Sequence, residues 1–382
     1  MKFVLLICCL VQLPFLIVVI YDFVTKELHN LRRYHIGRWA DETQWAEAVK
    51  NCAKKWLLNP PVVSSIDESQ YRLVKKLKGQ TISATIQSWQ NAGLSLGVQA
   101  AANTPQEKEL LRKWEQQLLN SDGTWKTPLK KIDWAMLGYA LLKHTDASEQ
   151  VKPAADQVLQ VIMDNLCEDG MISYSQGKNS NTRFVDTLGM VCPFLAIYGR
   201  LYHAPEVSAL AVRQIKLFRE NGLYTGTSLP CHAYDAKKRL PFGIYGWGRG
   251  TAWYTIALVD TWRELPEGSD KQKLRAWIIE AAEEYMQYQK LDGAYYTILQ
   301  GSGQYDSSAT AAMAYFYHVC ASIFDNEKYG EISQKCLKRL MQATMRDGAI
   351  DQCQGDTHSI GIFSQSFDVM PFVQGLILRA LY

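Results

Sequence analysis

The chain has 382 residues, of which 47% are hydrophobic and 21% charged, which is the profile of a packed globular protein. Its 41 basic and 38 acidic residues leave a formal net charge of only +3. Because the charge is balanced and no Lys/Arg-rich patch appears, the sequence excludes nucleic acid as an expected partner.

The first element in chain order is an apolar run, FVLLICCLVQLPFLIVVI, over residues 3–20. A helix of about 18 to 20 apolar residues is long enough to cross a bilayer. No small-residue cleavage site follows the run, so an uncleaved anchor is favoured over a cleaved signal peptide. We therefore expect residues 1–25 to be a membrane anchor or signal segment, and the protein to be membrane-anchored or exported, with a bacterial envelope as the favoured location. The flanking positive charges leave the side of the membrane open.

The remaining segment, residues 40–382, has the pattern of a helical protein. Long runs rich in Ala, Leu and Met carry apolar residues at helical spacing, as over residues 133–144, 281–290 and 307–324. Convincing alternating strands are absent, and no linker or change of composition divides the segment. We predict a single all-α domain over residues 40–382.

A short turn motif repeats along this helical segment. An acidic residue or Asn is followed by Gly and then by an apolar or aromatic stretch, at Asp122, Asp169, Asn221, Asp292 and Asp347. Each Gly is expected to end a helix in the left-handed conformation. A strongly apolar helix follows each turn, and with one more before the first turn these helices are predicted to begin near Ile82, Asp133, Phe184, Trp247, Ser307 and Phe363.

The repeats define six hairpins, each made of an amphipathic outer helix and an apolar inner helix. Because a helix that is apolar on all sides must be buried on all sides, the six inner helices are expected to pack together. A closed (α/α)6 toroid, preceded by the N-terminal apolar helix, satisfies this requirement. An open solenoid is the alternative, but six repeats can close a ring and the terminal repeats show no strongly polar capping face.

Residues that could carry chemistry gather at the predicted starts of the inner helices. In a toroid the loops from outer to inner helices open at one end, so these residues are expected to line one cup. The candidates are Trp89, Asp133, Trp134, Asp186, Trp247, Arg249 and Trp253, joined by His232 from the loop before the fourth inner helix. Carboxylates, Trp, Arg and His at one rim suggest a polar, ring-shaped, anionic ligand.

Each candidate also has a purely structural explanation. Asp133 and Asp186 lie where a helix N-cap is expected, and Asp is among the best N-cap residues. Arg249 could be an ordinary ion-pair partner, although its spacing places it on one helix face with Trp253, and the flanking glycines would let the backbone approach a ligand. The tryptophans could belong to the core, and His232 could be a loop histidine with satisfied hydrogen bonds.

Five segments of the chain resemble a known enzyme family. They are IDWAMLGYALL, FVDTLGMVCPFLA, GLYTGTSLPCHAYD, YGWGRGTAWYTIALVD and YDSSATAAMAYFY, in this order between Ile132 and Tyr317. Together they are similar to the unsaturated glucuronyl and rhamnogalacturonyl hydrolases, glycoside hydrolase families 88 and 105. The chain departs from the family pattern at Phe184, Thr251 and Asp306, differences that bear on substrate identity more than on reaction type.

This resemblance implies an (α/α)6 barrel that removes a 4,5-unsaturated uronic acid from the non-reducing end of lyase-generated oligosaccharides, with the rhamnogalacturonyl type favoured. A carboxylic acid protonates C4 of the double bond, water adds at C5, and the resulting hemiketal opens. The resemblance makes Asp186 the general acid/base and Asp133 its partner. It also makes Arg249 the partner of the uronate carboxylate, and it implies substrate contacts for His232, Trp89, Trp134, Trp247 and Trp253.

The implied chemistry needs a carboxyl group that is still protonated when substrate arrives. Burial among apolar residues and a nearby second carboxylate both raise a carboxyl pKa, and Asp186 has apolar neighbours in the sequence. No metal or organic cofactor is expected, since the hydration needs none and the nine cysteines form no C-x-x-C pair.

Two other functions fit the same sequence features. An inverting glycosidase would use Asp133 and Asp186 as acid and base on a saturated glycan, with a water between them. A membrane-tethered toroid that binds carbohydrate without catalysis is also compatible, because a fold alone does not specify a function. Isoprenoid cyclisation is disfavoured by the absence of an aspartate-rich D-x-D-D or D-D-x-x-D motif, and the oligomeric state is left open.

Overall fold

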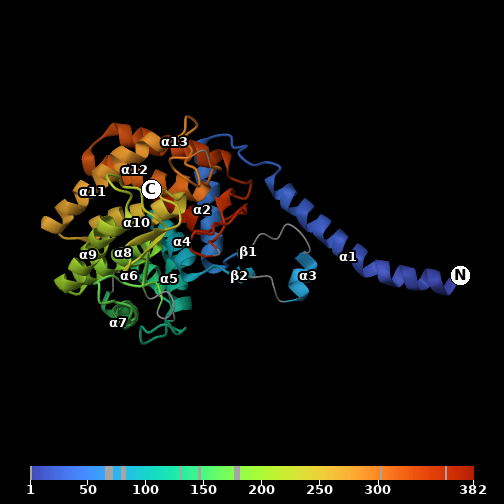
Figure 1. The fold of residues 1–382 in the computed structure, drawn as a ribbon, viewed down its shortest axis with the longest axis horizontal. Coiled ribbons are helices and arrows are strands. Elements are labelled where there is room, and N and C mark those ends of the chain that lie inside the picture. The colour runs from blue at the N-terminus through green and yellow to red at the C-terminus, as the bar shows by residue number, and fades with distance from the viewer. Residues whose placement is uncertain are drawn as a thin grey trace.

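The computed structural model describes residues 2–64, 72–78, 83–129, 131–144, 148–175, 181–301, 303–357 and 359–382. Figure 1 shows a ring of helices from which the N-terminal helix α1 (Lys2–Arg33) projects, with its first residues farthest from the ring. The C-terminal helix α14 (Phe372–Leu381) is part of the ring.

Six apolar helices form a closed inner ring. They are α4 (Ser88–Ala101), α6 (Trp134–His144), α8 (Val185–Leu201), α10 (Gly248–Glu264), α12 (Ser307–Phe324) and α14. Each packs against the next along the chain, and α14 packs back against α4. These helices are buried on nearly every side, as α12 is from Ser307 to Tyr317. The (α/α)6 toroid predicted from the sequence is therefore confirmed, and the contact between α14 and α4 rules out an open solenoid.

Six amphipathic helices surround the inner ring, and each precedes its inner partner in the chain. They are α2 (Glu42–Leu58), α5 (Pro105–Leu118), α7 (Ser148–Asp164), α9 (Pro205–Gly222), α11 (Ser269–Tyr285) and α13 (Glu327–Gln342). In α13 the buried residues Tyr329, Ile332, Cys336 and Leu340 recur every three to four positions, which is the spacing of one helix face. A short 3-10 helix, η1 (Met286–Tyr288), extends α11.

The repeated glycines form a tight turn a few residues after the outer helix, not at its last residue as expected. Gly293 and Gly348 adopt the left-handed conformation, with φ of 87° and 84°. A Cβ atom would lie 2.2 Å from the carbonyl oxygen of Lys335 at Gly293, and 2.1 Å from that of Ala48 at Gly348. Both turns thus pack against the backbone of the next outer helix, and the Gly348 turn joins α13 to α2. Gly222 departs from the pattern because it is the last residue of α9 and is not left-handed.

Short antiparallel strands occur in the loops that lead to the inner helices. The first pair is β1 (Val62–Ser64) and β2 (Ser83–Thr85), and the last is β6 (Cys353–Gln354) and β7 (Phe367–Asp368). Between them in the chain, a three-stranded sheet is formed by β3 (Thr182–Phe184), β4 (Ala233–Asp235) and β5 (Leu240–Phe242). Strands of two or three residues are too short to show alternation in a sequence, so none was predicted.

Four of the six inner helices begin within one residue of the predicted position. The predictions for the first and last were wrong, since α4 begins at Ser88 and α14 at Phe372 rather than near Ile82 and Phe363. Ile82 itself lies outside the described residues. In both places a strand pair occupies the segment before the helix, and its apolar residues were counted as helical. A short helix, α3 (Arg72–Leu77), also lies in the first of these loops.

The N-terminal helix keeps its expected helical form over residues 2–33. In the part of the chain that the structure describes, no helix combines the length and the apolar character needed to cross a membrane. The side chains of residues 1–10 lie outside that part. The anchor expected over residues 3–20, within the segment 1–25, therefore stays a prediction from the sequence.

Candidate active site

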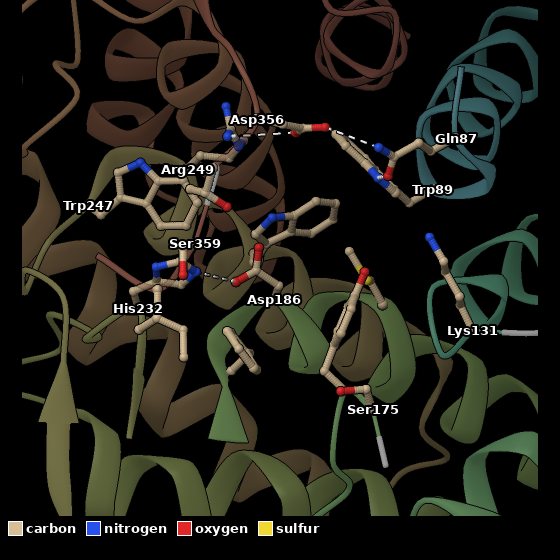
Figure 2. Close-up of a pocket in the computed structure, with 16 residues that line it drawn as sticks. Gln87, Trp89, Lys131, Ser175, Asp186, His232, Trp247, Arg249, Asp356 and Ser359 are labelled. Carbon is tan, nitrogen blue, oxygen red and sulfur yellow. Dashed lines mark hydrogen bonds and ion pairs between the residues drawn. The ribbon is translucent and has the colours of Figure 1, made fainter. Parts of the chain in front are cut away.

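A cavity of about 530 Å³ lies where several inner helices begin (Figure 2). The first turns of α4, α8 and α10 contribute Trp89, Asp186 and Arg249 to its wall. The loops that precede inner helices supply much of the remainder. The described residues that line it are Gln87, Trp89, Lys131, Tyr174, Ser175, Phe184, Asp186, Met190, His232, Trp247, Arg249, Trp253, Asp356, Thr357, Ser359 and Ile360.

Pairing of β3 with β4 places Asp186 beside His232. Phe184 is opposite Ala233 in this pair, and the backbone N–H of Val185 donates to the carbonyl oxygen of His232 at 3.0 Å. Helix α8 begins at Val185, so Phe184 occupies the N-cap position and Asp186 makes no capping hydrogen bond. The N-cap explanation for Asp186 therefore does not hold.

The carboxyl group of Asp186 is poorly compensated for its burial. Its Oδ2 atom is buried without a hydrogen-bond partner and lies 3.8 Å from Nε2 of His232 (Figure 2). Burial raises the pKa of Asp186, and the charges of His232 and Arg249 lower it, whereas that of Asp356 raises it, with a net upward shift. Asp186 thus keeps its proton at a pH at which an exposed aspartic acid would have lost it.

His232 presents a neutral imidazole to Asp186. Its Nδ1 atom accepts a hydrogen bond from the backbone N–H of Gly361 at 3.4 Å, which assigns the ring proton to Nε2, the atom nearer to Asp186. Burial lowers the pKa of His232, the charge of Asp186 raises it and that of Arg249 lowers it, with a net downward shift. The imidazole can therefore donate a hydrogen bond to Asp186 once that carboxyl group has lost its proton.

Arg249 is committed to the loop between β6 and β7. Its side chain is 3% exposed, and its guanidinium donates to the carbonyl oxygens of Gln354 and, at 2.7 Å, Gly355. One of its nitrogens lies 3.9 Å from Asp356 Oδ1. Arg249 and Trp253 both line the pocket from one helix face. The adjacent Gly248 serves packing, since a Cβ atom there would lie 2.6 Å from the carbonyl oxygen of Tyr296.

Asp356 is the pocket residue that the sequence gave no reason to select. Its Oδ2 accepts from Nε2 of Gln87 at 3.2 Å, and Gln87 Oε1 in turn accepts from the indole N–H of Trp89 at 2.6 Å. Figure 2 shows Asp356 between Arg249 and Gln87, where it joins two inner helices across the pocket. A second carboxylate near Asp186 was expected, with Asp133 as the candidate, and the charge of Asp356 also takes this part.

Asp133 and Trp134 are not among the described residues that line the cavity. Asp133 directly precedes α6, and its Oδ1 atom is buried without a hydrogen-bond partner. Burial raises the pKa of Asp133, while a hydrogen bond from Ser88 and the charge of Lys131 lower it, with a net upward shift. The charges of Asp133 and Asp186 both raise the pKa of Tyr174, after the larger effect of burial, so Tyr174 lies within electrostatic range of both.

The tryptophans divide into two groups. Trp134 packs edge-on against Trp125, with ring centroids 5.2 Å apart, and belongs to the partly buried periphery of the core. Trp89, Trp247 and Trp253 line the pocket although they are almost fully buried. They pack against one another, Phe372 and His232, so they form a rigid apolar wall beside the polar groups.

Lys131 adds an exposed cation to the wall across the pocket from His232 (Figure 2). Within the described part of the chain, no group of three or more His, Cys, Asp or Glu residues is arranged to hold a metal ion. The described polar groups of the pocket are thus carboxyl groups, an imidazole, two cations, an amide and hydroxyl groups.

A toroid with a buried carboxyl group, an imidazole and cations in its cup defines a glycosidase of the (α/α)6 class. The sequence model of Glycosyl Hydrolase Family 88 matches residues 65–380, and the chain belongs to that family. The family resemblance seen in the sequence is thereby confirmed.

Solved structures of related enzymes share the fold. A possible member of glycoside hydrolase family 105 from Klebsiella pneumoniae has a TM-score of 0.74 and 19% identity, over 90% of this chain and 93% of that chain. A family 105 glycoside hydrolase from C. acetobutylicum has a TM-score of 0.66 and 19% identity, over 80% and 95%. An unsaturated glucuronyl hydrolase from a Bacillus species, responsible for the degradation of glycosaminoglycan, has a TM-score of 0.62 and 17% identity, over 88% and 95%.

Proposed function

We propose that the protein removes a 4,5-unsaturated uronic acid from the non-reducing end of lyase-generated oligosaccharides by hydrating its vinyl ether. The observation that carries this proposal is the carboxyl group of Asp186, which is buried, has a raised pKa and faces a cavity lined by cations. Membership of family 88 supports it, as does the fold shared with an unsaturated glucuronyl hydrolase. Residues 40–382 form the catalytic domain in this proposal.

In the proposed reaction Asp186 acts first as an acid and then as a base. Its proton moves to C4 of the sugar, and the electron pair of the double bond forms the new C–H bond. Water attacks the electron-poor C5 and gives a proton back to Asp186. The resulting hemiketal opens, which breaks the bond to the neighbouring sugar and releases it. The Nε2–H group of His232 stabilises the Asp186 carboxylate between the two steps.

The remaining residues are proposed to bind the substrate. The charge of Arg249 attracts the uronate carboxylate, and Lys131 supplies a second cation on the opposite wall. Trp89, Trp247 and Trp253 give the sugar an apolar surface. The partner role of Asp133 and the substrate contact of Trp134 stay predictions from the resemblance. The same resemblance leads us to favour a rhamnogalacturonyl-type oligosaccharide.

An absorbance screen tests the proposed reaction. The conjugated double bond of the unsaturated uronate absorbs ultraviolet light, so hydration is expected to abolish this absorbance. The purified enzyme is mixed with lyase-cut pectic, glycosaminoglycan and ulvan-type oligosaccharides, and the absorbance is followed with time. The largest kcat/KM is expected for the rhamnogalacturonan product. Absence of any decrease over the whole panel would overturn the proposal, and a decrease confined to glycosaminoglycan products would overturn the preferred substrate.

Asp356→Asn is expected to shift the pH profile of kcat/KM to lower pH. Activity requires protonated Asp186, so it falls as the pH rises through the raised pKa of that group. The negative charge of Asp356 contributes to the raised pKa, and the substitution removes it. The alkaline limb of the profile should therefore move towards acidic pH, whereas asparagine keeps an oxygen that can accept from Gln87. An unchanged or alkaline-shifted limb would contradict the assignment of this limb to Asp186.

A further inference from the structure

One wall of the pocket is a hairpin formed by β6, β7 and the described loop residues 355–357 and 359–366. We call it the β6–β7 hairpin. It carries Asp356, Ser359 and Ile360 of the pocket lining. It also supplies both backbone carbonyl groups to which Arg249 donates. The shape of the site therefore depends on how this hairpin is held.

Arg33, the last residue of α1, binds the base of the β6–β7 hairpin. Its Nε and Nη2 atoms donate to the carboxylate of Asp351, at 2.7 Å for Nη2 to Oδ1. Nη2 also donates to the carbonyl oxygen of Phe367 at 2.9 Å. Asp351 lies just before β6 and Phe367 begins β7, so one guanidinium joins the two ends of the hairpin.

Asp351 is a well-anchored partner for this contact. Its side chain is 1% exposed, against 34% for that of Arg33. Its Oδ1 accepts from the backbone N–H of Gln352 at 2.7 Å, and its carbonyl oxygen accepts from the Ser307 hydroxyl at 2.6 Å. A carboxylate buried to this degree is costly without a cation, and Arg33 is the cation that binds it bidentately.

Hydrogen bonds lead directly from this base to the pocket. The backbone N–H of Gln354 donates to Oδ1 of Asp306, the N-cap residue of α12, at 3.1 Å. The side chain of Gln354 accepts from the indole N–H of Trp247 at 2.9 Å and donates to the carbonyl oxygen of Ser364 at 2.9 Å. Arg249 then binds the carbonyl oxygen of Gln354. Arg33 therefore fixes one end of the hairpin, and Arg249 fixes the end that faces the substrate cavity.

We propose that Arg33 is a positioning residue for substrate binding, because it holds the β6–β7 hairpin in the geometry that places Asp356 and the Arg249-binding carbonyl groups at the pocket. The catalytic part of this inference rests on the proposed function. Arg33 precedes residues 65–380, the part matched by the family, so the contact is a property of this chain's N-terminal segment. The segment is held further by Gly37, whose backbone N–H donates to the carbonyl oxygen of Thr344 at 2.9 Å.

The neighbouring Arg32 provides a matched control. It forms a 3.6 Å ion pair with Asp347 in which both side chains are more than half exposed, a kind of contact that contributes little. Arg33→Ala is expected to raise KM about tenfold and to change kcat by no more than about twofold. Arg33→Lys keeps the charge but loses the bidentate geometry, so its KM should be intermediate. Arg32→Ala should match the wild type.

Hydrogen exchange gives a readout that needs no substrate. The backbone N–H groups of Gln354 and Gly355 are protected by hydrogen bonds to Asp306 and to the Ser366 carbonyl oxygen. Their exchange should be faster in Arg33→Ala than in the wild type and in Arg32→Ala. Faster exchange in a protein without activity on unsaturated uronates would uphold the positioning role and overturn only the proposed function.

Two results would overturn the inference. One is exchange at Gln354 and Gly355 in Arg33→Ala that equals that of Arg32→Ala. The other is a loss of kcat with unchanged KM, which would indicate general damage and not a displaced binding wall. If Arg33→Ala does not fold, Arg33→Lys decides the question, since its exchange at these two amides must still exceed that of Arg32→Ala.

Discussion

Asp186→Asn is expected to lower kcat/KM on unsaturated uronates by about 10²- to 10⁴-fold, which is the range that general acid–base catalysis contributes. Asparagine has nearly the same shape, but it has no proton to deliver to C4 and no carboxylate to take a proton from water. Initial rates of absorbance loss measure the effect. An Asp186→Asn enzyme with more than about a tenth of the wild-type rate would show that another group supplies the proton.

Stability measurements separate this chemical loss from unfolding. Folding raises the pKa of Asp186, so the folded state is favoured below the pKa of the unfolded chain and loses that advantage as the pH rises through the folded value. At neutral pH the ionised side chain is therefore a cost to the wild type. Asp186→Asn removes the charge, and its melting temperature at pH 7 should be at least that of the wild type. A large decrease would mean that the lost activity reflects unfolding.

Arg249→Ala is expected to have the second largest effect, because it removes a substrate contact and a structural one together. The substitution leaves the carbonyl oxygens of Gln354 and Gly355 without these donors and removes the cation nearest to Asp356 among their hydrogen-bond and ion-pair partners. We expect a loss of about 2 to 4 kcal/mol in the free energy of unfolding and of at least about 10²-fold in kcat/KM. Denaturant unfolding and steady-state kinetics measure the two effects.

Two further variants show which part of Arg249 matters. Arg249→Lys keeps a positive charge, but one ammonium group lacks the planar fork that contacts both carbonyl groups. It should recover part of the stability while KM remains raised. Arg263 lies near the other end of the same helix and donates to the hydroxyl group of Tyr315, so Arg263→Ala should leave KM unchanged. Equal KM values for Arg249→Ala and Arg263→Ala would contradict a role for Arg249 in the pocket.

The ring could be predicted from the sequence because local signals repeat in it. A glycine turn followed by an apolar run marks the starts of α6, α8, α10 and α12 to within one residue. The first and last inner helices follow longer loops, whose short strands are stabilised by pairing between distant residues. No local periodicity reports such pairing, so Phe363 was taken for the start of a helix that begins at Phe372.

The candidate site could be predicted only where its residues lie on helices. Asp186, Arg249 and Trp253 were selected because helical spacing places them at the starts of inner helices, and all three line the cavity. Asp356 lies in the β6–β7 hairpin, where nothing in the neighbouring sequence distinguishes it from an ordinary polar loop residue. Its position depends on its contact with Gln87 from another repeat, which is visible only in three dimensions.

The packing of the Gly348 turn against α2 has a consequence for how such proteins diversify. An open array of repeats can gain or lose a unit at a cost limited to one interface. Here every unit has two neighbours, and deletion of one would leave a gap that the other five could not close without a change in every packing angle. Variation in chain length is therefore confined to the connecting loops. Those loops carry Asp356 and His232, so the ring holds the number of repeats constant while leaving substrate choice free to change.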